Sequence, residues 1–225
     1  GVMLHESFMD DKLSIQAGLF REASSGNDKM IDDVRNITTR ITFLPINNDN
    51  NLLHLGAAFS SRSSSDDTYS VSSRAENHLG TKLLDMDLDN VTGMNLMGAE
   101  MAFVMGSFSV QGEYVMNSVE AMEDYNFSGY YGQVSYFLTG EKRKYKNSLA
   151  GFDRVKPNNN MKEGEGWGAL ELAARYSSMD LSEAYEGVLN DITIGLNWYL
   201  NPCTRVMFNY VMGTMEDHLG EETTE

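Results

Sequence analysis

Hydrophobic and polar positions alternate along most of this chain, most clearly over residues 187–211. Over residues 192–200 the even positions are apolar, while most of the odd positions are polar or small. After a turn at residues 201–203 the alternation returns, with Val206 and Phe208 on one face and Arg205 on the other. A repeat of two is typical of strands with two unlike faces. This stretch therefore predicts two strands joined by a tight turn.

The same alternation recurs from one end of the chain to the other. Trp and Tyr residues lie near the ends of several of these segments, and such two-faced strands suit lipid on one side and water on the other. We therefore predict an all-β fold, a transmembrane antiparallel up-and-down β-barrel forming a single domain over residues 1–225. About twelve strands are expected, at residues 1–8, 13–20, 37–43, 53–59, 69–75, 82–86, 97–103, 110–116, 130–138, 167–176, 192–200 and 206–212.

The lengths of the connections predict how the strands are arranged. Outer-membrane barrels have short turns at the periplasmic end and longer loops at the outer end. We expect the tight turns at residues 10–11, 47–51, 106–107 and 201–203 to share one end, which requires one extra strand between residues 76 and 92. By the same count the long segment 139–166 lies at the periplasmic end. A turn of that length is unusual there, which leaves open that it folds into the lumen.

The two ends of the chain predict an internal piece of a larger barrel. The sequence has no initial Met and no signal peptide, and residues 215–225 form a polar tail. Bacterial barrels have even strand numbers and no free edge, and their last strand normally finishes in an aromatic residue. We therefore expect strands to be missing before Gly1 and one to be missing after Glu225.

Composition excludes several classes of function. A net charge of -16 argues against a nucleic-acid partner, because phosphate backbones select Lys and Arg surfaces. The single cysteine, Cys203, excludes an internal disulfide. The four histidines have no metal-ligand spacing, and no Ser, His and Asp set lies in a nucleophile motif. We expect neither an enzyme nor a bound metal or cofactor.

Three motifs, in order, carry a family resemblance. They are Phe137-Leu-Thr-Gly-Glu141 with the basic stretch that follows it, Leu170-Glu-Leu-Ala-Ala-Arg-Tyr-Ser177, and Gly195-Leu-Asn-Trp-Tyr-Leu-Asn-Pro202. With these motifs the chain resembles the phosphate-selective porin O and P family. The resemblance implies a sixteen-stranded homotrimeric barrel of the Gram-negative outer membrane that admits phosphate or polyphosphate. On that count the chain supplies strands four to fifteen.

The chemistry of such a pore is electrostatic. A guanidinium group stays charged, and its planar fork of N–H donors matches phosphate oxygens. The polar faces of the predicted strands carry Arg40, Arg74, Arg175 and Arg205, which we predict to line the pore and contact anions. If the long segment folds inward, it adds a basic cluster. Its members are Lys142, Arg143 and Lys144, with Lys146, Arg154 and Lys156 beyond them.

Acidic residues on the same faces leave a second interpretation open. Glu100, Glu113 and Glu171 are predicted lumen acids that could neutralise the arginines. Arg175 and Glu171 lie four residues apart on one face, so an ion pair between them and an anion-contacting role for Arg175 remain equally open. A basic cluster of this kind is more often a solvated loop than part of a pore, so that alternative stays open as well.

The overall charge leaves the selectivity of the pore open. The chain has 17 basic and 33 acidic residues, whereas a field of one sign concentrates ions of the opposite sign. Many acids fall in predicted loops, where they could meet divalent ions that bridge lipopolysaccharide. Such acids say nothing about the charge of the lumen. A weakly selective general porin, a plugged scaffold barrel and a soluble β-barrel binding module therefore stand as alternatives to an anion channel.

Overall fold

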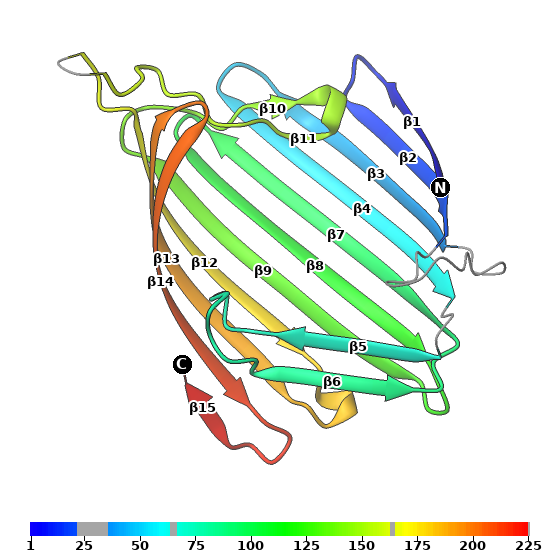
Figure 1. Ribbon diagram of the computed structural model, residues 1–225. Coiled ribbons are helices and arrows are strands. Elements are labelled where there is room, and N and C mark those ends of the chain that lie inside the picture. The colour runs from blue at the N-terminus through cyan, green and yellow to red at the C-terminus, as the bar shows by residue number, and fades with distance from the viewer. Residues whose placement is uncertain (22–35, 64–66, 163–164, 225) are drawn as a thin grey trace.

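The computed structural model describes residues 1–21, 36–63, 67–162 and 165–224 of the chain. Within these ranges eleven strands form one antiparallel sheet (Figure 1), so the all-β prediction is confirmed. The order in the sheet follows the chain: β1 (Val2–Phe8), β2 (Leu13–Phe20), β3 (Asn36–Asn47), β4 (Asn51–Ser63), β7 (Gly93–Met105), β8 (Phe108–Glu120), β9 (Tyr125–Phe137), β12 (Ala169–Asp180), β13 (Val188–Asn201), β14 (Thr204–Glu216) and β15 (Glu222–Thr224). The sheet is strongly curved but is not closed, and β1 and β15 are its edges (Figure 1).

The eight strands β3, β4, β7, β8, β9, β12, β13 and β14 have 12 to 14 residues each. A tilted strand of about 9 to 11 residues is long enough to cross a bilayer. Only two short helical turns occur among the described residues, η1 (Asn147–Leu149) and η2 (Ser182–Ala184). No helix in those parts of the chain is both long and apolar enough to cross a membrane.

The two faces of the sheet differ as the alternation predicted. One face carries large exposed apolar side chains, including Leu172, Ile194 and Phe208, the last of which is 72% exposed. The opposite face carries Glu171, Arg175 and other polar groups that line cavities. An apolar face of this extent is unfavourable in water and favourable against lipid. We refer to the polar face, on the concave side of the curve, as the inner face.

Four tight connections lie at one end of the sheet, as predicted. They join β1 to β2, β3 to β4, β7 to β8 and β13 to β14, and the connection from β9 to β12 starts from the same end. We refer to this as the turn end and to the other as the loop end. The predicted loop at residues 21–33 lies almost wholly outside the described residues.

Two of the twelve predicted strands do not belong to the wall. The strands predicted at residues 69–75 and 82–86 form β5 (Thr68–Ser73) and β6 (Leu84–Asp89), which pair only with each other. The extra strand required between residues 76 and 92 therefore exists, but it lies in an inward-folded hairpin (Figure 1). Each of the two strands has six residues, which is too short to cross a bilayer. In addition, the predicted polar tail contains β15, which pairs with the end of β14.

The hairpin β5–β6 packs against the inner face near the loop end. Leu84 and Met86 are fully buried in a cluster with Val119, Phe127 and Leu189 of the wall. At the tip of the hairpin, Ala75 lies against Gly213 of β14, where an added Cβ would collide with the Ala75 Cβ. The absence of a side chain at position 213 thus permits this close approach.

The long segment between β9 and β12 also folds against the inner face, at the turn end. Its strands β10 (Tyr145–Lys146) and β11 (Gly151–Phe152) form a second small hairpin. Tyr145 and Phe152 pack on Leu44, Leu52 and Val104 of the wall. The segment therefore folds inward, which the sequence left open.

Candidate functional site: an arginine-lined cavity

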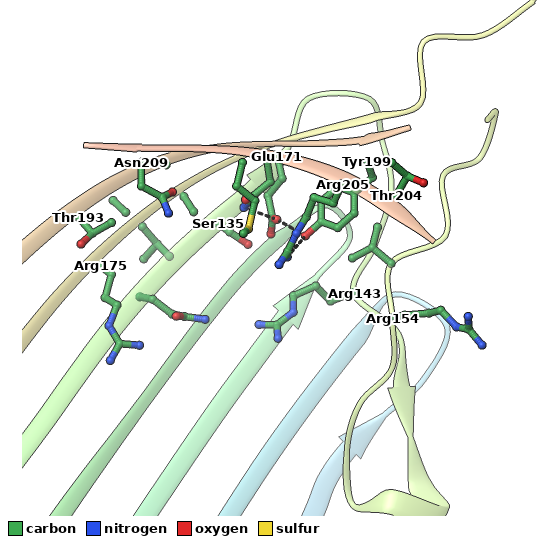
Figure 2. Close-up of a pocket in the computed structure, with 18 of the residues that line it drawn as sticks. Ser135, Arg143, Arg154, Glu171, Arg175, Thr193, Tyr199, Thr204, Arg205 and Asn209 are labelled. Carbon is green, nitrogen blue, oxygen red and sulfur yellow. Dashed lines mark hydrogen bonds between the residues drawn. The ribbon is translucent and has the colours of Figure 1, made fainter. Parts of the chain in front are cut away.

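A cavity of about 580 Å³ lies on the inner face towards the turn end. Its walls are strands β9, β12, β13 and β14. Residues 153–155 of the segment between β9 and β12, which we call the inward segment, border it. Four arginines line it: Arg143, Arg154, Arg175 and Arg205. The guanidinium groups of Arg143, Arg175 and Arg205 extend into the same open space, whereas Arg154 points away from them (Figure 2).

Arg175 is paired with an acid from the hairpin β5–β6. Its Nε donates to Oε1 of Glu76 over 2.7 Å, and its guanidinium stacks 3.8 Å from the centre of the Tyr131 ring. Ser177 donates to the same carboxylate at 2.8 Å, and Thr193 donates to its second oxygen at 2.6 Å. The pairing of Arg175 with Glu171 was one of two alternatives that the sequence left open, and the structure pairs Arg175 with Glu76 instead. Arg175 and Glu76 are 99 positions apart in the sequence, so no local pattern predicts their contact.

The carboxyl group of Glu76 is adapted to this contact. Burial by itself raises its pKa, but the hydrogen bonds from Thr193 and Ser177 and the charge of Arg175 outweigh burial and hold the pKa below its usual value. Glu76 is therefore ionised at neutral pH. It ties the tip of the hairpin to β12 and β13 of the wall.

Arg205 and Glu171 meet through a tyrosine. The Tyr199 hydroxyl donates to Oε2 of Glu171 at 2.8 Å and accepts a longer bond from Arg205 at 3.3 Å. The side-chain amide of Asn197 donates to the same Glu171 oxygen at 3.0 Å. Glu171 is thus held by neutral donors on β13, and Arg205 keeps most of its donor fork directed at the cavity.

Arg143 comes from the inward segment and reaches the same cavity. It donates to the side-chain oxygen of Gln111 at 3.0 Å, and its guanidinium lies 3.9 Å from the centre of the Phe152 ring. Burial lowers the pKa of the Arg143 guanidinium, which the negative charge of Glu171 partly offsets. Because the ordinary pKa of an arginine lies far above neutral pH, the guanidinium stays charged. Arg143 thus lies on the inner face, and its contact with anions stays a prediction.

The other predicted residues lie elsewhere on the inner side. Arg40 is on the inner face of β3, but it donates to Glu100 at 2.9 Å, and Glu100 also contacts His54 at 3.2 Å. Glu113 is on β8 and accepts a hydrogen bond from Tyr131. These acids therefore have partners within the wall.

Like Arg40, three further predicted basic residues do not reach the cavity. Arg74 was predicted to lie on a wall strand, and that prediction is wrong. It follows β5 in the hairpin, where its Nε donates to the carbonyl of Gly80 at 2.9 Å. Lys142 bonds the carbonyl of Asp49 in the β3–β4 turn. Lys144 is exposed. Whether any of them contacts anions stays a prediction.

The charge around the cavity differs from that of the chain. Its lining contains four arginines and three carboxylates, those of Glu76, Asp153 and Glu171. Whereas the whole chain has a net charge of -16, this lining has a small excess of positive charge. Glu76 and Glu171 accept hydrogen bonds from the wall, which hold the two carboxylates in place but leave them charged.

A curved antiparallel sheet of long strands, apolar outside and charged inside, with segments folded onto its inner face, defines part of the wall of a porin-type membrane β-barrel. The family model described as phosphate-selective porin O and P matches residues 1–223. The chain belongs to this family and is an outer-membrane protein.

Two relatives illustrate how far the similarity extends. The chain is 29% identical over 243 residues to Porin O of Pseudomonas aeruginosa, an alignment that covers 91% of this chain and 53% of that protein. It is 35% identical over 88 residues to an uncharacterized protein of Caulobacter vibrioides, covering 38% of this chain and 17% of the relative. The chain thus spans about half the length of Porin O.

Proposed function

We propose that this protein is a passive diffusion channel for small anions such as phosphate or polyphosphate, and not an enzyme. The observation that carries the proposal is the convergence of Arg143, Arg175 and Arg205 on one polar cavity of about 580 Å³. The three come from the inward segment, β12 and β14, so only the folded sheet brings them together. Membership of a family described as phosphate-selective supports the choice of anion.

The hydrogen bonding of these arginines suits transit better than retention. Among the described residues each of the three uses one N–H group on a protein acceptor: Arg143 on Gln111, Arg175 on Glu76 and Arg205 on Tyr199. The remaining donors can replace part of the hydration shell of an anion. Conduction requires contacts favourable enough to admit an ion and weak enough to release it. Partial occupation by protein acceptors keeps each contact weak.

The surroundings of the channel follow from the same proposal. Its outer apolar face contacts outer-membrane lipid, and the exposed acids at the loop end face lipopolysaccharide and its divalent counter-ions. Residues 1–225 form part of a single barrel domain, and the assembly is a homotrimer.

Ion-selectivity recording in planar bilayers tests the proposal. With a salt gradient across the bilayer, the wild-type reversal potential is expected to favour anions. In the double variant Arg143→Gln with Arg205→Gln the anion-to-cation permeability ratio is expected to fall roughly three-fold or more, because the local field that concentrates anions is weakened. Inorganic phosphate is expected to reduce chloride current in the wild type more than in the variant.

The matched control is Lys162→Gln, which removes an exposed basic residue paired with Glu165 in the inward segment. It is expected to leave the reversal potential unchanged. A wild-type pore that prefers cations, or a double variant that behaves like Lys162→Gln, contradicts the proposal. An electrically silent protein contradicts it too and supports the scaffold alternative.

A further inference from the structure

Strand β6 carries a regular stripe of acidic residues. Its sequence is Leu84-Asp-Met-Asp-Leu-Asp89, in which Leu84 and Met86 are buried and the three aspartates are exposed. Successive side chains of a strand point to opposite faces. Since the leucines and the methionine pack on the wall, the alternation directs Asp85, Asp87 and Asp89 away from the wall. The hairpin itself lies inside the curve of the sheet (Figure 1).

The neighbours of the stripe leave most of its charge in place. Asp85 pairs with Lys82 at 3.1 Å, and both side chains are about half exposed. Asp87 accepts a hydrogen bond from Ser70 of β5, a neutral donor. Lys82 offsets one of the three negative charges, and the other two remain. The hairpin therefore presents a net negative surface to the conduit.

The acidic stripe and the arginine cavity occupy different levels of the conduit. The hairpin packs on Leu189 near the loop end, whereas Tyr199, beside Arg205, lies ten residues further along β13. At about 3.3 Å per residue this corresponds to roughly 30 Å along the strand. The pair of Arg175 with Glu76, in which the opposite charges offset each other, lines the part of the arginine cavity that is nearer to the hairpin, beside Thr193.

We propose that Asp85, Asp87 and Asp89 form a second selectivity element in series with the arginine cavity, so that the conduit is bipolar, acidic at the loop end and basic at the turn end. This inference rests on the proposed function, because it requires the conduit to conduct. At about 0.1 M salt the Debye length is near 10 Å. Two zones on the order of 30 Å apart then act as separate fixed charges.

A bipolar conduit passes more current in one direction than in the other. When the loop end is positive, cations enter through the acidic zone and anions enter through the basic zone, so each ion enters where its concentration is already raised. Both then accumulate in the middle and the conductance is high. With the opposite polarity each ion meets the zone that repels it, and the middle of the conduit is depleted. The current is therefore larger with the loop end positive.

The test is the current–voltage curve of the reconstituted protein at about 0.1 M and about 1 M salt, the second of which shortens the Debye length to about 3 Å. Cys203, exposed in the β13–β14 turn, fixes the orientation, because a membrane-impermeant charged thiol reagent alters the current only from the turn side. We expect the wild type to pass roughly two-fold more current with the loop end positive at about 0.1 M and nearly equal currents at about 1 M.

The decisive variant is Asp85→Asn with Asp87→Asn and Asp89→Asn, which keeps the size of the side chains and an acceptor for Ser70. It is expected to lose most of the asymmetry and to become more selective for anions. The matched control, Glu123→Gln with Asp124→Asn and Glu222→Gln, removes three exposed acids from the β8–β9 connection and from β15, outside the hairpin, and is expected to retain the asymmetry.

The outcomes separate this inference from the proposed function. A symmetric wild-type curve at about 0.1 M salt, or an asymmetry that the hairpin variant retains, overturns the bipolar conduit while leaving anion conduction through the arginines in place. An asymmetry of opposite sign overturns it too. Anion selectivity that does not depend on Arg143 and Arg205 overturns the proposed function instead. A protein that conducts no ions overturns both.

Discussion

The two segments that fold onto the inner face are held there by different forces. The hairpin β5–β6 packs through an apolar cluster that contains Leu84 and Met86, and one ionised residue, Glu76, ties down its tip. The segment between β9 and β12 has a smaller apolar cluster and more polar contacts. Arg143 bonds Gln111, Tyr145 bonds His54, and Arg40 bonds the carbonyl of Ala150.

This difference matches the charge that each segment brings into the conduit. The apolar anchor of β6 uses one face of the strand, which leaves the other face free to carry Asp85, Asp87 and Asp89. The second segment instead uses charged groups as anchors, and Arg143 serves both as an anchor and as part of the cavity wall. Removal of an apolar anchor should therefore release the first segment, whereas the second should loosen one contact at a time.

The largest effect is expected from Leu84→Ala. Leu84 is 0% exposed, and removal of such a side chain leaves a cavity that costs about 2 to 5 kcal/mol. The hairpin should undock, and trypsin should then cleave after Arg74 and Lys82 more than ten-fold faster. The control is Leu79→Ala, because Leu79 is 94% exposed in the same hairpin. Equal cleavage of the two variants would show that the cluster does not hold the hairpin.

A smaller loss is expected from Glu76→Gln. The carboxylate accepts charge-assisted hydrogen bonds whose loss costs about 2 kcal/mol. Because the pKa of Glu76 is held below its usual value, its contribution to docking is present above the ordinary carboxyl pKa and is lost as the pH falls through the lowered one. Single-channel recordings of the wild type should therefore become noisier in acid. Glu76→Gln should show that noise already at neutral pH.

The close approach at the hairpin tip predicts a steric effect. In Gly213→Ala the new methyl group collides with Ala75, and overpacking of this kind costs about 1 to 3 kcal/mol. The tip should shift from β14, with faster trypsin cleavage after Arg74. Gly98→Ala is the control on the inner face, since a Cβ there would meet only ordinary contacts at 3.8 and 3.9 Å. If both variants resist trypsin like the wild type, the tip is not constrained by Gly213.

The smallest effect is expected in the second segment, from Tyr145→Phe. Burial raises the pKa of Tyr145 to about 12, so its hydroxyl stays protonated and bonded to Nδ1 of His54 at 2.8 Å. Loss of that one bond costs about 1 kcal/mol. Trypsin cleavage after Lys144 and Lys146 should rise several-fold at most, while cleavage in the hairpin β5–β6 stays unchanged. A change as large as that of Leu84→Ala would mean that the two segments are anchored alike.

The predictions of strands and of the directions of their side chains depended on neighbours along the chain, and most of them were right. Phe208 and Ile194 face outward and Arg175 and Arg205 inward because a strand sets these directions residue by residue. The strand predicted at residues 69–75 failed as a wall strand because an apolar face at every second position looks the same whether it meets lipid or the inner wall. Glu76, in a stretch without clear periodicity, was missed for a related reason. Its partners are about a hundred residues away.

The sequence by itself determined the two-faced strands, because these depend on local alternation. It also determined the end at which the tight turns gather, which depends on the lengths of the connections, and the number of charged residues, which is its composition. Only the tertiary structure decided which segments leave the wall and which charges meet. That choice follows from packing between distant parts of the chain: Leu84 buried on Leu189, Ala75 against Gly213, and Arg175 bound to Glu76 and not to Glu171. Such contacts have no counterpart in the local pattern, and they place the arginines and the aspartates at different levels of one conduit.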